Sequence, residues 1–285
     1  AARYRSAYSR HRRLNQGINM NTTDQATGQS WPAFASHRGY RRMFAANQLT
    51  LGIFLLLLFY KGDMAVLAGQ AERVRDLDRY GFAAVWVRDV PLFDPAFGDA
   101  GQVFDPFTYL AFLAAHTQRI ALATGSAIFS LRHPIDLAKA SATIDQLSNG
   151  RLVMGIASGD RAIEFPAYGL EHARRGERFA QSVTYFRQLM QARAPVIDSA
   201  LGHMAGAEFL PRPVAGAIPL MVTGSSRQSL AWIGEHADGW LTFPESTHDR
   251  QGPQRLAEKI RAWRQLIPDG GFRPHMTNEW LDLVD

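Results

Sequence analysis

The chain of 285 residues contains no cysteine. This absence excludes disulfide bonds, thiolate metal centres and a cysteine nucleophile. The sequence also has no GxSxG nucleophile motif, no Walker A phosphate loop and no His, Asp or Glu residues at metal-ligand spacing. The enzyme classes built on those motifs are therefore excluded, and we expect no bound metal.

Acidic residues are nearly absent from the first 48 positions, which hold one acid, Asp24, and eight arginines. This stretch carries a charge of +7, so the remaining residues carry −2 of the net +5. The stretch also lacks sustained apolar periodicity, and this absence is typical of disordered segments. We therefore predict a basic, disordered N-terminal extension over residues 1–43 and one folded domain over residues 44–285. Because the positive charge belongs to the extension, we expect no nucleic-acid-binding face on the folded domain.

No apolar run is long enough to span a membrane. The longest run, residues 49–60 (LTLGIFLLLLFY), holds 12 residues, whereas a spanning helix needs about 20. With Arg41 and Arg42 upstream it could mimic a secretory signal, but no small-residue cleavage site follows convincingly. A parallel strand buried on both faces explains the run better. We expect no membrane partner and, given the lack of cysteine, a cytoplasmic location.

From residue 49 onward, short apolar runs alternate with segments of helical periodicity. Repeated strand–helix units predict an α/β fold with a parallel sheet, either a barrel or a doubly wound sheet. No GxGxxG follows the first strand and the units are evenly sized, so we favour a TIM-type (β/α)8 barrel. The predicted strands cover residues 49–58, 82–87, 119–129, 151–157, 219–223, 239–243 and part of 272–282. The predicted helices cover residues 67–81, 106–116, 133–147, 173–193 and a segment from 226 to 237.

In such a barrel the active site forms from loops at the carboxyl ends of the strands. The clearest candidate follows the strand at 219–223, where Gly224 permits a tight turn. Ser225 and Ser226 then start a helix, with Ser229 one turn further. Free amides, the positive end of the helix dipole and hydroxyl groups together favour a phosphate. The alternative is that Ser225 or Ser226 only caps the helix.

A second small-residue turn follows the strand at 151–157. Ser158 and Gly159 lie there and suit the close approach of a planar or phosphorylated ligand. The alternative is a plain connection between strand and helix.

Two candidate catalytic residues follow other strands. Asp89 lies just after residues 82–87, where it would either accept a proton or form a structural pair with Arg88 or Arg132. His133 lies in the turn that leads into the next helix, where it would either act in catalysis or cap that helix.

Residues 119–160 (RIALATGSAIFSLRHPIDLAKASATIDQLSNGRLVMGIASGD) resemble the bacterial luciferase-like flavin monooxygenases and oxidoreductases. The shared pattern is a strand, a helix opened by His-Pro, the sequence DQLSxGR and a strand that ends in a small-residue turn. Residues 219–240 (PLMVTGSSRQSLAWIGEHADGW) match a second feature of the family, and residues 86–107 (WVRDVPLFDPAFGDAGQVFDPF) are similar to an uncharacterised luciferase-type subgroup. The similarity extends over residues 44–285. It implies a TIM-type barrel that uses reduced FMN or, in some branches, the deazaflavin F420.

The resemblance also implies roles for particular residues. The three serines of the 224–229 turn fall where the luciferase α subunit contacts the flavin phosphate. Ser158 falls where that protein has a phosphate-binding arginine. Ser126 and Ala127 fall on its non-proline cis peptide beneath the flavin ring, so a cis bond is expected between these two residues.

Two positions depart from luciferase. Its histidine implicated in proton transfer aligns with Val90, and its reactive cysteine aligns with Ala157. Light emission is therefore not implied, and Asp89 and His133 are the nearest residues that could inherit an acid or base role. The family usually continues with a last strand and helix, whereas this chain ends at Asp285, so we expect a barrel that lacks its last strand–helix unit.

The resemblance favours a two-component monooxygenase that uses reduced FMN and O2 on a small organic substrate. A separate flavin reductase would supply the reduced FMN, and Phe93, Phe97 and Phe104 would line the substrate side. One alternative is an F420-dependent hydride-transfer oxidoreductase, and another is a non-catalytic flavin-binding protein of the same fold. Whether the chain forms a homodimer is left open.

Overall fold

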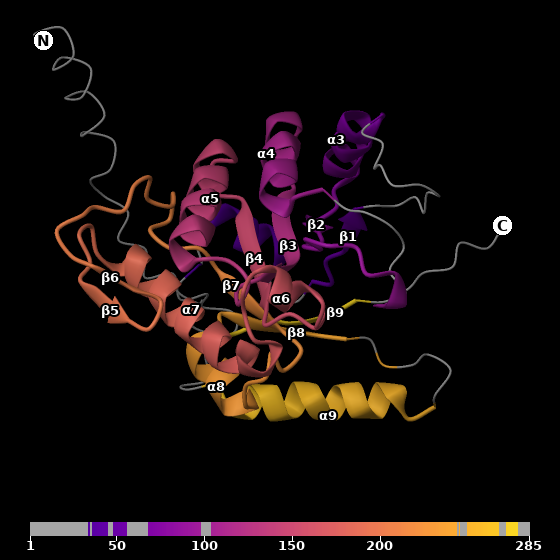
Figure 1. Cartoon of the computed structure of the whole chain (residues 1–285). Helices are drawn as coiled ribbons and strands as arrows, with labels where there is room; N and C mark the ends of the chain where they lie inside the picture. The colour runs from indigo at the N-terminus through magenta and orange to yellow at the C-terminus, as the bar shows by residue number, and fades with distance from the viewer. Residues whose placement is uncertain are drawn as a thin grey trace, which may run out of the picture.

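The computed structural model describes residues 34, 36–44, 48–55, 68–97, 104–243, 245, 250–267 and 272–278. Among these residues, seven parallel strands form one curled sheet with helices around its outer face (Figure 1). In sheet order these strands are β1 (Gly52–Leu55), β2 (Ala84–Val87), β3 (Ala121–Ile128), β4 (Leu152–Ala157), β7 (Leu220–Thr223), β8 (Gly239–Thr242) and β9 (His275–Thr277). The helices are α2 (Arg38–Met43), α3 (Gln70–Tyr80), η2 (Pro95–Phe97), α4 (Pro106–His116), α5 (Pro134–Leu147), α6 (Glu164–Ala167), η3 (His172–Arg174), α7 (Arg175–Gln191), α8 (Leu230–His236) and α9 (Gly252–Gln265).

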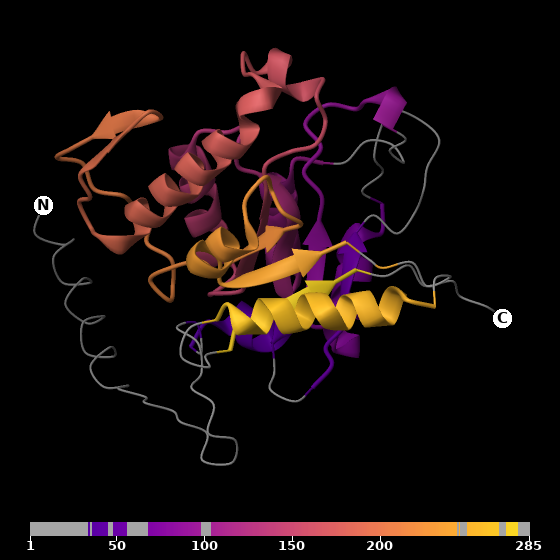
Figure 2. The ribbon, with the colours of Figure 1, turned by 90° about the horizontal axis from the view of Figure 1, so that it is seen from below.

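The sheet does not close among the described residues, because β1 and β9 are its two outermost strands. Ile53 of β1 pairs with Val85 of β2, and Leu241 of β8 pairs with Met276 of β9. In Figure 2, α9 runs along the β8–β9 side of the sheet. The predicted α/β barrel without its last strand–helix unit is confirmed as a TIM-like, half-barrel arrangement.

Both faces of the sheet are apolar because both are covered. On the outer face, Val85 and Leu122 pack against the helices in the larger core. The inner face is built largely from small residues such as Ala84 and Ala121, which leave room inside the curl for the indole ring of Trp86. Side chains that alternate between the two faces thus fill two separate cores.

The apolar run at residues 49–60 is a strand only in part. β1 covers residues 52–55, and residues 56–60 lie outside the described part of the chain. Leu49 is 92% exposed and Leu51 is 59% exposed, so the prediction of burial on both faces is wrong for this end of the run. The reason is that β1 is an outermost strand with β2 as its neighbour. Among the described helices, none has both the length and the apolar content that crossing a bilayer requires.

Helix α2 lies within the segment predicted to be a disordered extension, and the structure places it against the sheet instead. Tyr40 is 1% exposed and packs with Phe34 and Phe44 on the inner face of the sheet. The Gly39 amide donates to the Gly150 carbonyl oxygen at 3.0 Å. A side chain at position 39 would collide with the backbone of the β4 start, so glycine is required for this contact. The rest of the predicted extension lies outside the described residues.

Besides the short helices η2, α6 and η3, the structure has a hairpin and a long helix that do not appear in the sequence-based prediction. The first is an antiparallel hairpin of β5 (Ile197–Ser199) and β6 (Gly202–Met204), inserted between α7 and β7. The second is α9, whose Trp263 is fully buried. The hairpin strands have three residues each, which is too short for an alternation pattern to show in the sequence.

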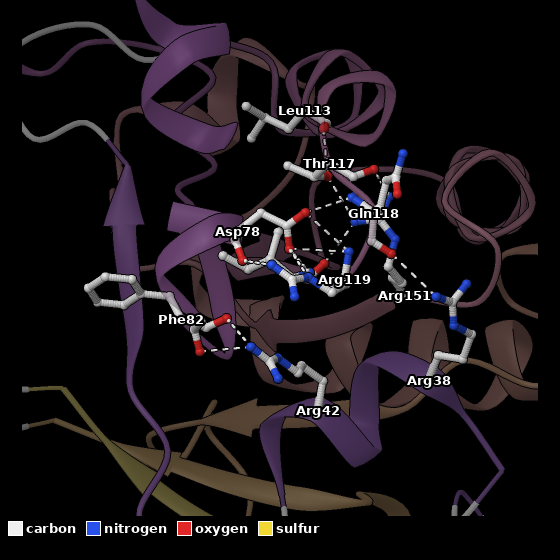
Figure 3. A network of polar contacts seen from close by, with 11 residues as sticks. Arg38, Arg42, Asp78, Phe82, Leu113, Thr117, Gln118, Arg119 and Arg151 are labelled. Atoms are coloured by element: carbon white, nitrogen blue, oxygen red, sulfur yellow. Dashed lines mark hydrogen bonds and ion pairs between the residues drawn. The ribbon is translucent and has the colours of Figure 1, made fainter. Parts of the chain in front are cut away.

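A network of polar contacts fixes the amino end of β3 (Figure 3). The carboxylate of Asp78 accepts hydrogen bonds from the backbone amides of Gln118, Arg119 and Ile120, at 2.7–3.3 Å. Burial raises the pKa of Asp78, but these backbone donors outweigh it, so the pKa lies below its ordinary value. The carboxylate thereby supplies acceptors for a turn whose amides would otherwise have none.

Arg151 holds the same turn from the other side (Figure 3). Its buried guanidinium donates to Thr117 Oγ1 and the Ile120 carbonyl oxygen at 2.8 Å, and to the Ala114 and Thr117 carbonyl oxygens at 3.2 and 3.0 Å. Burial lowers the pKa of Arg151 to about 10. The arginine of the DQLSNGR sequence therefore satisfies the carbonyl groups at the end of α4.

Replacing Asp78 by Asn is expected to lower the free energy of unfolding by about 1–2 kcal/mol, because the amide leaves a buried backbone N–H without an acceptor. The difference from the wild type should shrink below about pH 4, since a carboxyl whose pKa is lowered by folding stabilises the fold only while ionised. Urea unfolding at neutral and acidic pH measures both effects. Asp76→Asn, in an exposed pair with Arg79 on the same helix, should change stability by less than about 0.5 kcal/mol.

Candidate functional site

The loops at the carboxyl ends of β2, β3, β4 and β7 meet at one end of the sheet, as parallel strands require. Direct contacts join them: Ser130 Oγ donates to the Ser158 carbonyl oxygen at 2.6 Å, and Ser126 Oγ contacts Thr223 Oγ1. The sequence-predicted site residues all lie in these loops or in the last residues of β3. They therefore share one end of the sheet.

The turn after β7 has an unusual backbone. Gly224, Ser226 and Arg227 have φ angles of 57°, 44° and 64°. A non-glycine residue in this region costs about 1–3 kcal/mol and is found mainly where the surroundings enforce it, often at functional sites. Ser226 Oγ donates to the Thr223 carbonyl oxygen at 2.8 Å, and Ser225 Oγ accepts from the Arg227 amide at 3.2 Å. The Ser225 hydroxyl proton has no acceptor within the described part of the chain and can donate to a ligand.

The helix after this turn starts later than the sequence suggests. α8 begins at Leu230, and Ser229 caps it by accepting from the Trp232 amide at 3.1 Å. The sequence analysis had offered helix capping as the alternative role of Ser225 or Ser226, and in the structure Ser229 has that role. Ser225 and Ser226 lie before the helix and do not form its N-terminus, so the predicted support from the helix dipole is wrong. A phosphate site here depends on the turn itself and on what surrounds it.

The start of α7 packs directly against this turn. Gln228 Nε2 donates to the Gly176 carbonyl oxygen at 2.7 Å. A Cβ atom on Gly176 would lie 2.7 Å from the Cβ atom of Arg227, so only glycine permits this approach. Arg227 and Arg175 are brought to the same place from positions 52 residues apart in the sequence.

The guanidinium groups of Arg175 and Arg227 and the imidazole of His172 form a cluster beside the turn, which we call the cationic cluster after its two arginines. Burial and then the charge of Arg227 lower the pKa of Arg175, and burial, Arg175 and Arg227 lower the pKa of His172. Asp160 is the carboxylate that opposes these effects. Within the described residues, His172 Nε2 and Arg175 Nε are buried without a hydrogen-bond partner. Unsatisfied buried donors next to positive charge indicate a place for an anion.

The sequence-based prediction missed this cationic cluster. Arg227 lies inside the GSSRQS sequence that predicted the phosphate site, so the sequence alone could have identified it as a candidate phosphate ligand. Arg175 and His172 come from a different unit, and only the fold brings them near the turn. A cavity of about 350 Å³ beside the turn is lined by Ala173, Arg174, Gly176, Glu177, Ala180, Arg227 and Gln228.

The turn after β4 is tightly packed. Ser158 is buried, and Gly159 has a φ of 80°. A Cβ atom on Gly159 would lie 2.9 Å from Ile128 Cγ2 and 3.2 Å from Phe165 Cζ. Glycine is therefore required by this packing, and contact of Ser158 or Gly159 with a cofactor stays a prediction.

A non-proline cis peptide is present in β3, but it joins Gly125 to Ser126. The predicted bond between Ser126 and Ala127 is therefore off by one residue. Gly125 lies so close to the ring of Phe54 that a side chain would not fit, and the register with β4 shifts between Thr124 and Ala127. The resemblance identified the segment but did not separate neighbouring small residues. Ala127 is fully buried, whereas Ser126 is partly exposed beside Thr223.

Asp89 forms the structural pair that was one of its two predicted roles. Both its carboxylate oxygens accept from the guanidinium of Arg132, with Arg132 Nη2 to Oδ1 at 2.7 Å. Oδ2 also accepts from the Ile128 amide at 2.9 Å, and the residue is 3% exposed. Burial lowers the pKa of Arg132, but the hydrogen bond and charge of Asp89 outweigh it and raise the pKa overall. This geometry ties the end of β2 to the end of β3.

His133 caps α5, the alternative that the sequence left open. Its Nδ1 accepts from the Ile135 amide at 3.2 Å, and its Nε2 lies 2.8 Å from the Leu201 carbonyl oxygen in the β5–β6 hairpin. Both ring nitrogens therefore have partners, which assigns the proton to Nε2. Asp89 and His133 have separate partners, and a catalytic role for either stays a prediction.

Two further features of this end of the sheet were not expected. Glu164, at the start of α6, is 1% exposed, and burial raises its pKa. Phe104, predicted to line the substrate side, instead packs on Tyr109 at a centroid distance of 5.3 Å within the larger core. Phe93 and Phe97 are 46% and 44% exposed, as residues lining a substrate site would be.

The larger cavity, about 660 Å³, lies at the opposite end of the sheet. It is lined by Arg75, Asp78, Arg79, Ala115, His116, Thr117, Gln118 and Arg119. It lies at the C-terminal ends of α3 and α4, where cations stabilise the last carbonyl groups, so we do not assign it to the reaction. No group of three or more metal-binding side chains occurs in the part of the chain that the structure describes.

Known proteins resemble this chain in both sequence and structure. An uncharacterized protein of Mycobacterium tuberculosis is 28% identical over 229 residues, which cover 75% of this chain and 79% of that protein. The 4-hydroxyprotoasukamycin monooxygenase of Streptomyces nodosus subsp. asukaensis is 26% identical over 69% of this chain and 53% of its own length. The F420-dependent glucose-6-phosphate dehydrogenase of Nakamurella multipartita is 29% identical over 65% of this chain and 52% of its own length. The chain spans about half the length of these two relatives.

Two solved structures have the same fold. Monooxygenase RslO1 from Streptomyces bottropensis superposes with a TM-score of 0.66 and 24% identity, over 80% of this chain and 70% of that one. The oxygenating constituent of 3,6-diketocamphane monooxygenase from Pseudomonas putida, in complex with FMN, superposes with a TM-score of 0.64 and 15% identity. The match covers 80% of this chain and 66% of that one. The family described as luciferase-like monooxygenase matches residues 50–269. The chain therefore belongs to the luciferase-like monooxygenase family.

Proposed function

We propose that this chain is a flavin-dependent oxidoreductase, and specifically a two-component monooxygenase that uses reduced FMN and O2 on a small organic substrate. The observation that carries the proposal is the cationic cluster of Arg175, Arg227 and His172 beside the strained turn at residues 224–227. A separate flavin reductase would supply the reduced cofactor. A homodimer and a cytoplasmic location belong to the same proposal.

The residues of this end of the sheet fit a cofactor that carries a phosphate. Among the residues that the structure describes, Arg175 Nε and His172 Nε2 are buried donors without partners, and the Ser225 hydroxyl has no acceptor. Together with the Arg227 guanidinium they would hold a dianion by charge-assisted hydrogen bonds. The cofactor, when bound, supplies the redox chemistry.

The substrate side would be formed by the loop after β2. Phe93 and Phe97 are half-exposed there, and the guanidinium carbon of Arg161 lies 4.4 Å from the centroid of the Phe97 ring. Apolar walls of this kind bind an organic substrate and exclude water from the reacting atoms. Asp89 and His133 are held in structural contacts, so we propose that they position loops; proton transfer by either is the alternative.

The second candidate is an F420-dependent hydride-transfer oxidoreductase, which the similarity to an F420-dependent glucose-6-phosphate dehydrogenase favours. A non-catalytic flavin-binding protein would use the same cationic cluster. Fluorescence titrations with FMN, riboflavin and F420 distinguish the cofactors. Oxygen-dependent turnover with a flavin reductase, above the rate of free reduced flavin, distinguishes an enzyme from a binding protein. A protein that binds neither FMN nor F420 would contradict the proposal.

Replacing Ser225 by Ala should weaken FMN binding by about 1.5 kcal/mol, which is the lower end of what one hydrogen bond to a charged group contributes. Riboflavin lacks the phosphate, so its affinity should stay the same. The measurement is the dissociation constant of both ligands for both proteins. Equal losses for FMN and riboflavin would show that Ser225 does not contact the phosphate.

A further inference from the structure

Two hydroxyl groups meet on the inner face of the sheet at its carboxyl end. Ser126 Oγ of β3 contacts Thr223 Oγ1 of β7, although β4 lies between these two strands. Gly155 of β4 has no side chain to separate them, and a Cβ atom there would lie 3.3 Å from Trp86 of the inner core. Thr223 follows Met221 of the same core by two residues and so shares its face. Both hydroxyl-bearing residues are partly exposed, so a ligand can reach the pair from this end.

An extra residue in β3 turns Ser126 toward the inner face. Ala123 belongs to the inner core and Leu122 to the outer one, so strict alternation would place position 126 on the outer face. The register with β4 shifts by one residue between Thr124 and Ala127, and Ala127 lies in the outer core instead. Bulges of this kind redirect a side chain and are common beside active sites.

The proton count of the pair leaves one donor available. The two hydroxyl groups carry two protons, and only one of them lies in their mutual contact. Neither oxygen has another hydrogen-bond partner among the residues that the structure describes. The hydroxyl that accepts within the pair therefore keeps a proton for a ligand. Because a hydroxyl that accepts a hydrogen bond becomes a better donor, the pair offers one polarised O–H group to an acceptor atom.

The pair lies between the two halves of the proposed site. On one side, Thr223 is followed directly by the turn at residues 224–227, beside which the cationic cluster would hold a phosphate. On the other side, β2 neighbours β3 and leads into the loop that carries Phe93 and Phe97. A cofactor whose phosphate is bound at the turn and whose reacting part meets the substrate must therefore cross the inner face at Ser126 and Thr223.

We propose that the Ser126–Thr223 pair binds the ring system of the cofactor by donating one hydrogen bond to a ring carbonyl oxygen or ring nitrogen. This inference rests on the proposed function, because the phosphate site determines where the ring lies. Phe54 and Trp86 of the inner face supply apolar contact, which has no direction. A hydrogen bond does have a direction, so the pair sets which edge of the ring faces the substrate loop. Thr223 is the residue of this pair that the sequence did not single out.

The double variant Ser126→Ala/Thr223→Val removes both hydroxyl groups and keeps the branched shape at position 223. Its dissociation constants for FMN and for riboflavin should both rise about three- to tenfold, as expected for the loss of one hydrogen bond to a neutral ring atom. Riboflavin has the same ring without the phosphate, so the two losses should be equal, unlike those expected for Arg227→Met. The visible absorption band of the bound flavin should also shift, because the ring loses a polarising donor.

The control Thr184→Val makes the same change at an exposed position on α7 and should alter neither the affinity nor the absorption band. Thr223→Ser keeps a hydroxyl group and should preserve both. If the double variant does not fold, Thr223→Val alone replaces it and should give a smaller loss in the same direction for both ligands.

An unchanged riboflavin affinity together with an unchanged absorption band would overturn the proposal and leave the pair a structural link between β3 and β7. FMN that binds the wild type and the variant equally contradicts this inference alone. A wild type that binds neither FMN nor F420 contradicts the proposed function as well, so the two failures are distinguishable.

Discussion

Replacing Asp89 by Asn should lower the free energy of unfolding by about 3 kcal/mol, the low end of what breaking a buried ion pair costs. The asparagine has one acceptor oxygen where the carboxylate has two, so it cannot accept at both of the positions to which Arg132 and the Ile128 amide now donate, and it carries no charge. The guanidinium of Arg132, with a side chain 18% exposed, would be left without its close partner. For a chain of this size the loss corresponds to roughly 6–12 °C in melting temperature, which calorimetry measures.

Asp105 provides the matched control. Its carboxylate lies 3.7 Å from Arg132 Nη2, but its side chain is 50% exposed. Asp105→Asn should therefore lower the free energy of unfolding by less than about 1 kcal/mol through this pair. Any weakening of the N-terminal cap that Asp105 provides to α4 adds to that loss. Single-turnover kinetics on the Asp89 variant separate the two roles that the sequence left open. An unchanged melting temperature with turnover reduced about tenfold or more would make Asp89 an acid or base.

Replacing Arg227 by Met should raise the dissociation constant of FMN by about 10–100-fold, since a charge-assisted contact with the phosphate is lost. Methionine keeps the unbranched side chain and the same backbone strain at a φ of 64°, so the turn should survive. The affinity for riboflavin should change by less than about threefold. Fluorescence quenching at two salt concentrations measures the effect, which should fall as salt rises.

Arg174 is the control for charge alone. It lies close in sequence to Arg175 but pairs with Glu177 at 3.1 Å, with 65% of its side chain exposed. Arg174→Met should change FMN affinity by no more than a few-fold. If Arg174→Met and Arg227→Met weaken FMN equally, the effect reflects the overall charge of this end of the sheet, and the phosphate site is not where we place it.

The strands that the sequence predicts well are those buried on both faces. β2, β4 and β7 are apolar along nearly their whole length, because both faces of the sheet are covered there. α2 was missed for a physical reason. Its arginines suggest solvation, yet Arg38 and Arg42 donate to the backbone carbonyl oxygens of Asn149 and Gly81 and so help to fix the helix.

The candidate site was predictable only where its residues are close together in the sequence. Gly224 and Ser225 were found because one turn holds both. Arg175 lies beside that turn because its neighbour Gly176 packs against Arg227, and no local sequence pattern predicts this approach. For Asp89, the strand pattern placed the residue correctly, but only the geometry of Arg132 showed that both carboxylate oxygens are occupied.

The packing of α2 has a practical consequence for anyone who expresses this protein. The family match begins at residue 50, so a gene trimmed to the match would omit Phe34, Tyr40 and Phe44. These side chains cover Trp86 and the alanines on the inner face of the sheet. Their removal would expose this apolar face to water. Such a product is expected to aggregate, and its failure to bind a cofactor would say nothing about the loops at the other end of the sheet.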